Sequence, residues 1–175
     1  MTNSSVRCST LAALLVTALL SVGVRAQLSS PIAGGLASGT GAGVHSPNSP
    51  IAPLQARADV LAWSVLTDVK TKVEKNRMLP VFATQVQALH RKTQRVQGFM
   101  MPLDAGKTQT HFLLSAVPLS CSFCLPGGPE SLVEVKTKTP IKYSLEPVVV
   151  EGQFSVLRDD PNGVYYRITD AIAVQ

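Results

Sequence analysis

The chain has 175 residues, of which 45% are hydrophobic and 15% are charged. Once a leader and a linker are set aside, this length leaves room for about one domain and excludes a second core. The formal net charge is +5, but two of the basic residues, Arg7 and Arg25, lie in the leader. The remaining excess is too small to indicate a nucleic-acid partner, and none is expected.

The first 26 residues have the layout of a secretory signal peptide. Arg7 precedes an apolar run of 14 residues, from Leu11 to Val24, and Val24-Arg25-Ala26 supplies the small-residue cleavage motif. A membrane-spanning helix needs about 20 apolar residues, so we expect cleavage after Ala26 and no transmembrane anchor in the mature form. The chain is therefore predicted to be exported, to the periplasm if the source is Gram-negative.

Residues 27–56 are rich in Ser, Gly, Pro and Ala and carry almost no charge. Such a stretch buries too little apolar surface to offset the backbone entropy lost on ordering. We predict a flexible linker over 27–56 and a folded domain over 57–175.

The folded part opens with two different periodicities. Residues 69–74 alternate Val or Thr with Lys or Glu, which predicts a half-buried strand that Pro80 ends. Phe82, Val86 and Leu89 then recur at helical spacing, which predicts a helix of about three turns.

Five later segments read as strands separated by turn-forming residues: 93–103, 109–117, 131–138, 148–157 and 164–174. Short strands in this number favour a barrel, because an open antiparallel sheet would expose its edges. The predicted fold is mainly β, a small oligonucleotide/oligosaccharide-binding-type barrel with one short helix; the alternative is a β-sandwich. Gly98 and Gly152 are expected at bends or bulges where the barrel turns.

The segments "VQGFMMPLDAGKTQTHFLLS", "CSFCLPGGPESLVEV" and "VEGQFSVLRDDPNGVYYRITDA" follow one another in a specific order and spacing. In this the chain resembles a bacterial exported family catalogued as domain of unknown function number 3299. The resemblance covers most of residues 61–171 and implies an exported small barrel of the same type with no established activity. In many members the loop reads Cys-x-His before a run of prolines, whereas here Phe123 stands in the histidine position and Cys124 is additional. A metal held by the family's Cys and His would here depend on Cys121 and Cys124.

The Cys121-Ser122-Phe123-Cys124 motif carries most of the chemistry in the sequence. An oxidising compartment favours a disulfide, which would brace the loop locally. A redox pair lacks support, because the prolines and glycines that follow cannot start the helix that lowers a thiol pKa. A zinc or copper site is the third interpretation, but a closed zinc site needs four ligands, so His111, His90 or Glu130 would have to complete it.

Outside this motif, the residues that could carry chemistry have ordinary explanations. His111 should point outward if its neighbour Phe112 points inward. His90 should lie at the end of the predicted helix, and Asp159 and Asp160 should form a turn.

The sequence thus predicts an exported binding or accessory module that acts in metal handling or envelope assembly through the cysteine loop, with an envelope protein or a transporter as partner. One alternative is a thiol-disulfide oxidoreductase that uses the same cysteines. Another is a structural, partner-binding barrel with an inert disulfide, which an exposed apolar patch beside bonded cysteines would favour.

Overall fold

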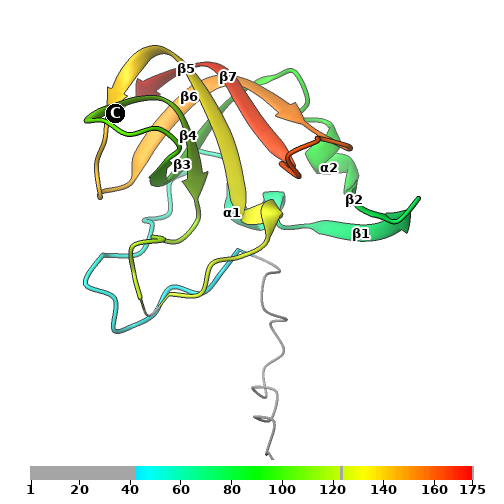
Figure 1. Cartoon of the computed structure of the whole chain (residues 1–175), viewed down its shortest axis with the longest axis horizontal. Helices are drawn as coiled ribbons and strands as arrows, with labels where there is room; N and C mark the ends of the chain where they lie inside the picture. The colour runs from blue at the N-terminus through cyan, green and yellow to red at the C-terminus, as the bar shows by residue number, and fades with distance from the viewer. Residues whose placement is uncertain (1–41, 123, 175) are drawn as a thin grey trace, which may run out of the picture. The chain divides into compact units, whose positions relative to one another are not determined.

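The computed structural model describes residues 42–122 and 124–174 (Figure 1). The predicted signal peptide, residues 27–41 of the predicted linker, and Phe123 lie outside the described residues. The elements, in chain order, are α1 (Trp63–Leu66), β1 (Val69–Glu74), β2 (Arg77–Phe82), α2 (Thr84–Gln87), β3 (Thr93–Pro102), β4 (Thr108–Ser115), the 3₁₀ helix η1 (Pro129–Ser131), β5 (Leu132–Lys142), β6 (Val148–Val156) and β7 (Tyr166–Val174). None of the helices among these residues is long and apolar enough to cross a membrane.

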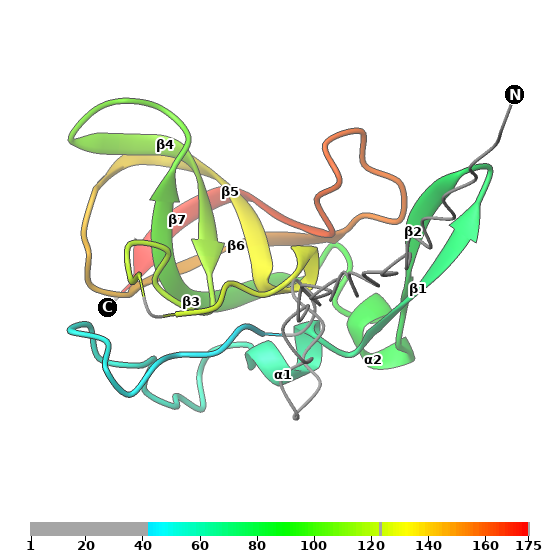
Figure 2. The same ribbon diagram turned by 60° about the horizontal axis from the view of Figure 1, so that its bottom comes forward.

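Five strands close into a barrel in the order β3-β4-β5-β7-β6, and β6 pairs with β3 to complete it (Figure 2). All neighbours are antiparallel except β5 and β7, which run parallel. A five-stranded barrel of mixed order is consistent with the oligonucleotide/oligosaccharide-binding type. The barrel prediction is therefore confirmed over the β-sandwich, and each of its strands corresponds to one of the five segments identified from the sequence.

The inside of the barrel is filled by side chains that alternate with outward-facing ones along each strand. The fully buried set comprises Val96, Phe112, Leu114, Val133, Val135, Val150, Phe154, Tyr166, Ile168 and Ala171. Leu66 from α1 and Val86 from α2 join this core. The Tyr166 hydroxyl donates a hydrogen bond of 2.6 Å to the carbonyl of Leu66, which satisfies a polar group that would otherwise be buried unpaired.

Gly98 and Gly152 lie where the barrel changes direction, as predicted. Gly98 is the last residue of β3 that pairs with β6, and Phe99 is the first that pairs with β4. Gly152 lies in the register shift between β6 and β7. A Cβ on Gly152 would lie 2.6 Å from Cγ2 of Ile168, so only glycine lets β7 approach this closely.

We expect Gly152→Ala to lower the free energy of unfolding by about 1–3 kcal/mol, because the added methyl must displace Ile168 or the backbone of β7. Urea unfolding would measure the change, with Gln153→Ala, an exposed neighbour on β6, as the matched control. Equal stability of the two variants would contradict the role given to this glycine.

The region before the barrel differs from the prediction. Residues 69–74 do form a strand, but it pairs only with β2 in an exposed hairpin and is not half-buried. Pro80 does not end a strand: it lies inside β2, opposite Thr71. The hairpin depends on a two-residue turn at Lys75 and Asn76, both with positive φ, which is the geometry of a tight hairpin turn. The sequence of this turn contains no glycine, the residue that usually indicates such a turn.

The predicted helix of three turns is only four residues long. Phe82, assigned to the helix from its spacing, belongs to β2 and packs edge-on against Tyr165 at 5.9 Å. The helix ends early because the following turn bonds to the barrel: the N–H of Arg91 donates to the carbonyl of Phe154 at 2.7 Å. Tertiary hydrogen bonds therefore override the local helical spacing.

Candidate functional site

Cys121 and Cys124 are joined by a disulfide in the connection between β4 and η1. Both residues are nearly buried, and the N–H of Cys124 donates to the carbonyl of Cys121 at 3.1 Å in a tight turn. Of the three interpretations of the motif, the structure contains the disulfide. A bonded sulfur is neither a thiolate ligand nor a thiolate nucleophile, so metal binding and thiol exchange both require reduction first.

The proposed additional metal ligands lie apart from this disulfide. His111 is four residues before the end of β4, about 13 Å along an extended strand from the start of the loop. His90 accepts a hydrogen bond of 3.1 Å from the N–H of Val156, and Glu130 is buried in η1. Within residues 42–122 and 124–174, no three His, Cys, Asp or Glu side chains are placed to hold a metal ion. The metal set of Cys121 and Cys124 with His111, His90 or Glu130 stays a prediction for the reduced protein.

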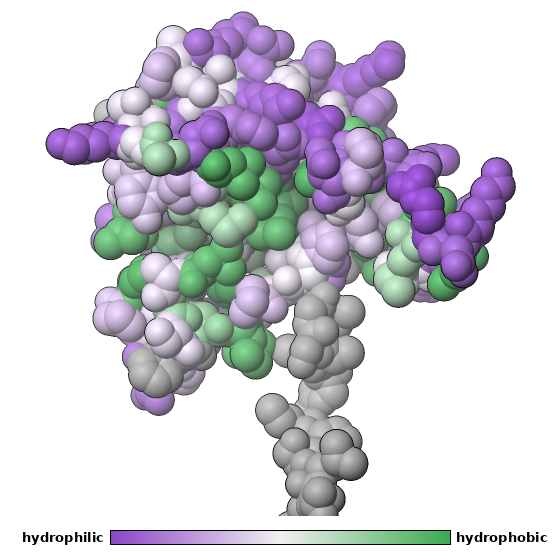
Figure 3. All heavy atoms as spheres, viewed as in Figure 1, coloured by the Kyte–Doolittle hydropathy of each residue, from purple (hydrophilic) through white to green (hydrophobic). Residues whose placement is uncertain are grey.

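An apolar groove lies directly beside the disulfide loop. Three segments line it: residues 99–102 from β3, residues 118–120 just before Cys121, and residues 143–145 between β5 and β6. Its volume is about 160 Å³, and none of its lining residues is charged. Figure 3 shows hydrophobic residues gathered over the lower part of one face, below a hydrophilic region. We call the surface lined by these three segments the groove.

Three large apolar side chains of the groove are exposed, although their loops are otherwise polar. Leu145 is 58% exposed, Leu119 is 40% exposed and Tyr143 is 36% exposed. No local pattern in the sequence predicts them, because a single leucine in a Ser- and Pro-containing loop carries no periodic signal. A large apolar residue in each of two predicted connections would have indicated them, because connections lie at the surface and carry binding residues.

Residues 118–120, one wall of the groove, lead into the disulfide loop, which is held by backbone hydrogen bonds at several points. The N–H of Cys121 donates to the carbonyl of Pro118 at 3.3 Å, so the wall residues lead directly into the disulfide turn. Val44 and Leu125 exchange two backbone hydrogen bonds, of 2.8 and 2.9 Å. This contact lies in the described part of the predicted linker; the flexibility of 27–56 as a whole stays a prediction. None of residues 121–130 lines the groove, and a functional role of the cysteine loop stays a prediction.

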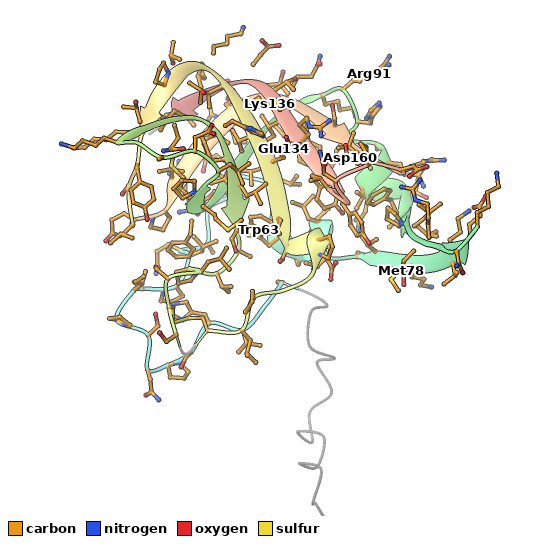
Figure 4. All side chains as sticks on the ribbon, in the orientation of Figure 1. Trp63, Met78, Arg91, Glu134, Lys136 and Asp160 are labelled. Carbon is orange, nitrogen blue, oxygen red and sulfur yellow. A yellow bond between two sulfur atoms is a disulfide. The ribbon has the colours of Figure 1, made fainter. Side chains whose placement is uncertain are left out.

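Apart from the apolar groove, a group of polar side chains lies on the outer face of β4, β5 and β7 (Figure 4). Glu134 is at its centre, with only 7% of its side chain exposed. It accepts hydrogen bonds from Nε2 of His111 at 2.7 Å and from Nε of Arg167 at 2.5 Å. Arg167 also donates to Asp160 at 2.9 Å, and Lys136 lies 3.7 Å from Glu134.

The network explains where His111 and Asp160 point. His111 faces outward, as predicted, while Phe112 is fully buried. Asp160 forms the predicted turn, since it accepts from the N–H of Asn162 at 2.9 Å, and it also pairs with Arg167. Glu134 and Arg167 were missed because their contact depends on the parallel pairing of β5 with β7, which no local pattern reveals.

Burial alone would raise the pKa of Glu134, but the hydrogen bonds from His111 and Arg167 outweigh it and hold the pKa below its ordinary value of 4.5. A carboxylate with a lowered pKa in the folded state stabilises the fold above about pH 4.5, and this contribution is lost as the pH falls towards the folded pKa. Glu134 and its partners thus link β4, β5 and β7, and the stabilisation that they provide decreases as the pH falls below about 4.5.

We expect Glu134→Gln to lower the free energy of unfolding at pH 7 by about 1.5–3 kcal/mol, because hydrogen bonds to a charged group are lost. The variant should also lose less stability than the parent protein when the pH is lowered below 4.5. Urea unfolding across a pH series would measure both effects. Glu146→Gln, at an exposed position, is the control and should change stability by no more than about 0.5 kcal/mol.

We expect a free-thiol count of zero for the protein starting at Gln27, because its two cysteines are bonded to each other. Replacing both by serine should lower the free energy of unfolding by about 2 kcal/mol or less, since the closed loop is short. Reduced parent protein should match the double variant. Two free thiols in the oxidised, folded protein would contradict the disulfide assignment.

The fold and the groove together define a small β-barrel of oligonucleotide/oligosaccharide-binding type with a disulfide-braced apolar edge. The family described as Protein of unknown function (DUF3299) matches residues 52–169, and the chain belongs to that family. The chain is also similar to a DUF3299 family protein from Pseudomonas aeruginosa PAO1, whose crystal structure has been solved. The two sequences are 21% identical, and the match covers 55% of this chain and 68% of that chain with a TM-score of 0.40. No curated protein matches the chain.

Proposed function

We propose that this domain is an exported binding module that uses the groove beside the disulfide loop to hold one or two apolar side chains of another envelope protein. The single observation that carries the proposal is an uncharged groove with one wall, residues 118–120, that leads directly into a bonded cysteine pair. This is the combination expected of a structural, partner-binding barrel.

The size of the groove favours a side chain over a small molecule. Pockets for drug-sized ligands usually enclose about 300–1,000 Å³ and include a few well-placed polar groups. The groove encloses about 160 Å³, and its lining contains no charged residue to orient a polar ligand. Met100 and Met101 contribute flexible side chains that adapt to differently shaped apolar groups. A leucine or an aromatic side chain from a partner loop would fit these conditions.

Export supports a fixed rather than a reactive cysteine pair. In an oxidising compartment a disulfide persists, so the wall formed by residues 118–120 keeps one path. Metal handling through Cys121 and Cys124 and thiol-disulfide exchange through the same residues are the competing functions. Both functions would require reduction of the disulfide between Cys121 and Cys124. In both, the two free thiols rather than the groove would determine activity.

Binding of an apolar side chain can be tested with methionine methyl groups as probes. In protein that starts at Gln27 and carries ¹³C-methyl methionine, we expect a synthetic peptide with two adjacent leucines in a Gly-Ser background to shift the signals of Met100 and Met101. Met78, which does not line the groove, serves as an internal control. Leu119→Ser with Leu145→Ser should remove the shifts, because the two exposed walls lose their apolar surface.

The matched control is Ile172→Ser, which removes an apolar side chain of similar exposure from β7, outside the groove. The control should leave the shifts unchanged. Equal shifts of the methyl signals of all three methionines, or no shifts, would contradict the proposal that the groove binds apolar side chains. Stoichiometric zinc or copper uptake by the reduced protein that disappears when Cys121 and Cys124 are replaced would instead favour metal handling.

A further inference from the structure

The hairpin of β1 and β2 is a surface feature that the groove does not explain. It forms a two-stranded sheet of its own and projects from the barrel in both ribbon views (Figures 1 and 2). Isolated two-stranded hairpins are at best marginally stable in water. This one nevertheless exposes Val73 by 74% and Met78 by 68%, a cross-strand pair near its tip.

The two edges of the hairpin are unequal. Residues 77–80 of β2 line a surface depression together with residues 157–161 and 163–165 between β6 and β7, and Arg77 pairs with Asp159 of that connection. Pro80 further blunts this edge, because it has no N–H to offer a partner. β1 is exposed from Lys70 to Glu74, and the described part of the chain places no strand against its outer edge.

The backbone of β1 is arranged to receive a strand. In a hairpin with a two-residue turn, Glu74 and Arg77 form the first hydrogen-bonded pair, and such pairs then alternate along the ladder. The N–H groups of Thr71 and Val73 consequently point away from β2. An edge with outward N–H and C=O groups and no proline is a template for an added strand.

The two faces of β1 specify the chemistry of that strand. Lys70 and Lys72 lie on one face, while Thr71 and Val73 lie on the other, next to Met78. The hairpin and its turn contain four basic residues and one acidic residue, Glu74, which already pairs with Lys72 at 2.8 Å. A strand beside β1 would meet positive charge on one face and apolar surface on the other.

We propose that the outer edge of β1 binds an extended segment of a partner protein in which acidic side chains alternate with apolar ones. The acidic side chains lie beside Lys70 and Lys72, and the apolar ones continue the surface of Val73 and Met78. The observations favour this occupant over a membrane, because the tip that would enter the lipid is Lys75-Asn76 and the apolar pair lies on one face. A second copy of the chain would bring the same excess of basic residues to the interface.

The test uses the protein that starts at Gln27 and a synthetic peptide in which glutamate and valine alternate. We expect binding that strengthens as the salt concentration is lowered and that shifts the amide signals of residues 69–74 in ¹⁵N spectra. Thr71→Pro should weaken binding at least about tenfold, because it removes an outward N–H. Thr71→Ala is the matched control, which keeps the N–H, and should bind within about twofold of the parent protein.

A charge-reversal variant keeps the test decisive if the proline disturbs the hairpin. Lys70→Glu with Lys72→Glu leaves the backbone unchanged, and it should lose the acidic peptide and instead bind one in which lysine and valine alternate. Binding of both peptides by the parent protein, or of neither, overturns the proposal. So does dimerisation through β1, or binding of the hairpin to phosphatidylglycerol vesicles in the absence of any peptide binding.

Discussion

Closure of the barrel at Gly152 is the constraint on which the rest of the structure depends. β6 and β7 approach so closely there that a Cβ would lie 2.6 Å from the backbone oxygen of Thr169 as well as from Ile168. β7 pairs antiparallel with β6 on either side of this register shift, and its other edge pairs parallel with β5. That parallel pairing brings Arg167 to Glu134 and so ties the polar network together across three strands.

A barrel closed this tightly is filled by its own side chains, which leaves function to its outside. Phe112, Phe154 and Tyr166 occupy the interior and are fully buried. The surfaces available to a partner are consequently the connections between strands and the parts of the chain that do not join the barrel. The groove belongs to the first kind, since two of its three walls are connections. The β1 and β2 hairpin belongs to the second.

The sequence predicted the barrel well because strand alternation and turn residues are local signals. All five barrel strands were located, and Gly98 and Gly152 were correctly expected at bends. Features that depend on contacts between distant segments were not predictable in this way. The helix after Phe82 was overestimated because hydrogen bonds to β6 end it, and β2 was missed because its turn, Lys75-Asn76, lacks glycine.

The candidate site was predicted only in part, for the same reason. The motif indicates the cysteine loop and leaves three interpretations open, of which the structure contains the disulfide, with both cysteines buried. Leu119 and Leu145 are 26 residues apart in the sequence, so their meeting in one groove follows from the barrel and not from any motif. His111 was considered as a metal ligand, whereas its hydrogen bond to Glu134 accounts for its orientation without the cysteines.

The distribution of exposed apolar residues connects the groove with the hairpin. Folding favours the burial of large apolar side chains, and single exposed ones are common on any protein. Here several of them gather: Leu119, Tyr143 and Leu145 surround the groove, while Val73 and Met78 form a cross-strand pair on the hairpin. The two groups have different chemistry, since the groove has no charged lining and the hairpin is rich in lysine. A domain with two such surfaces can hold two different partners at once, so the two proposals together describe an adaptor and not a carrier of a single ligand.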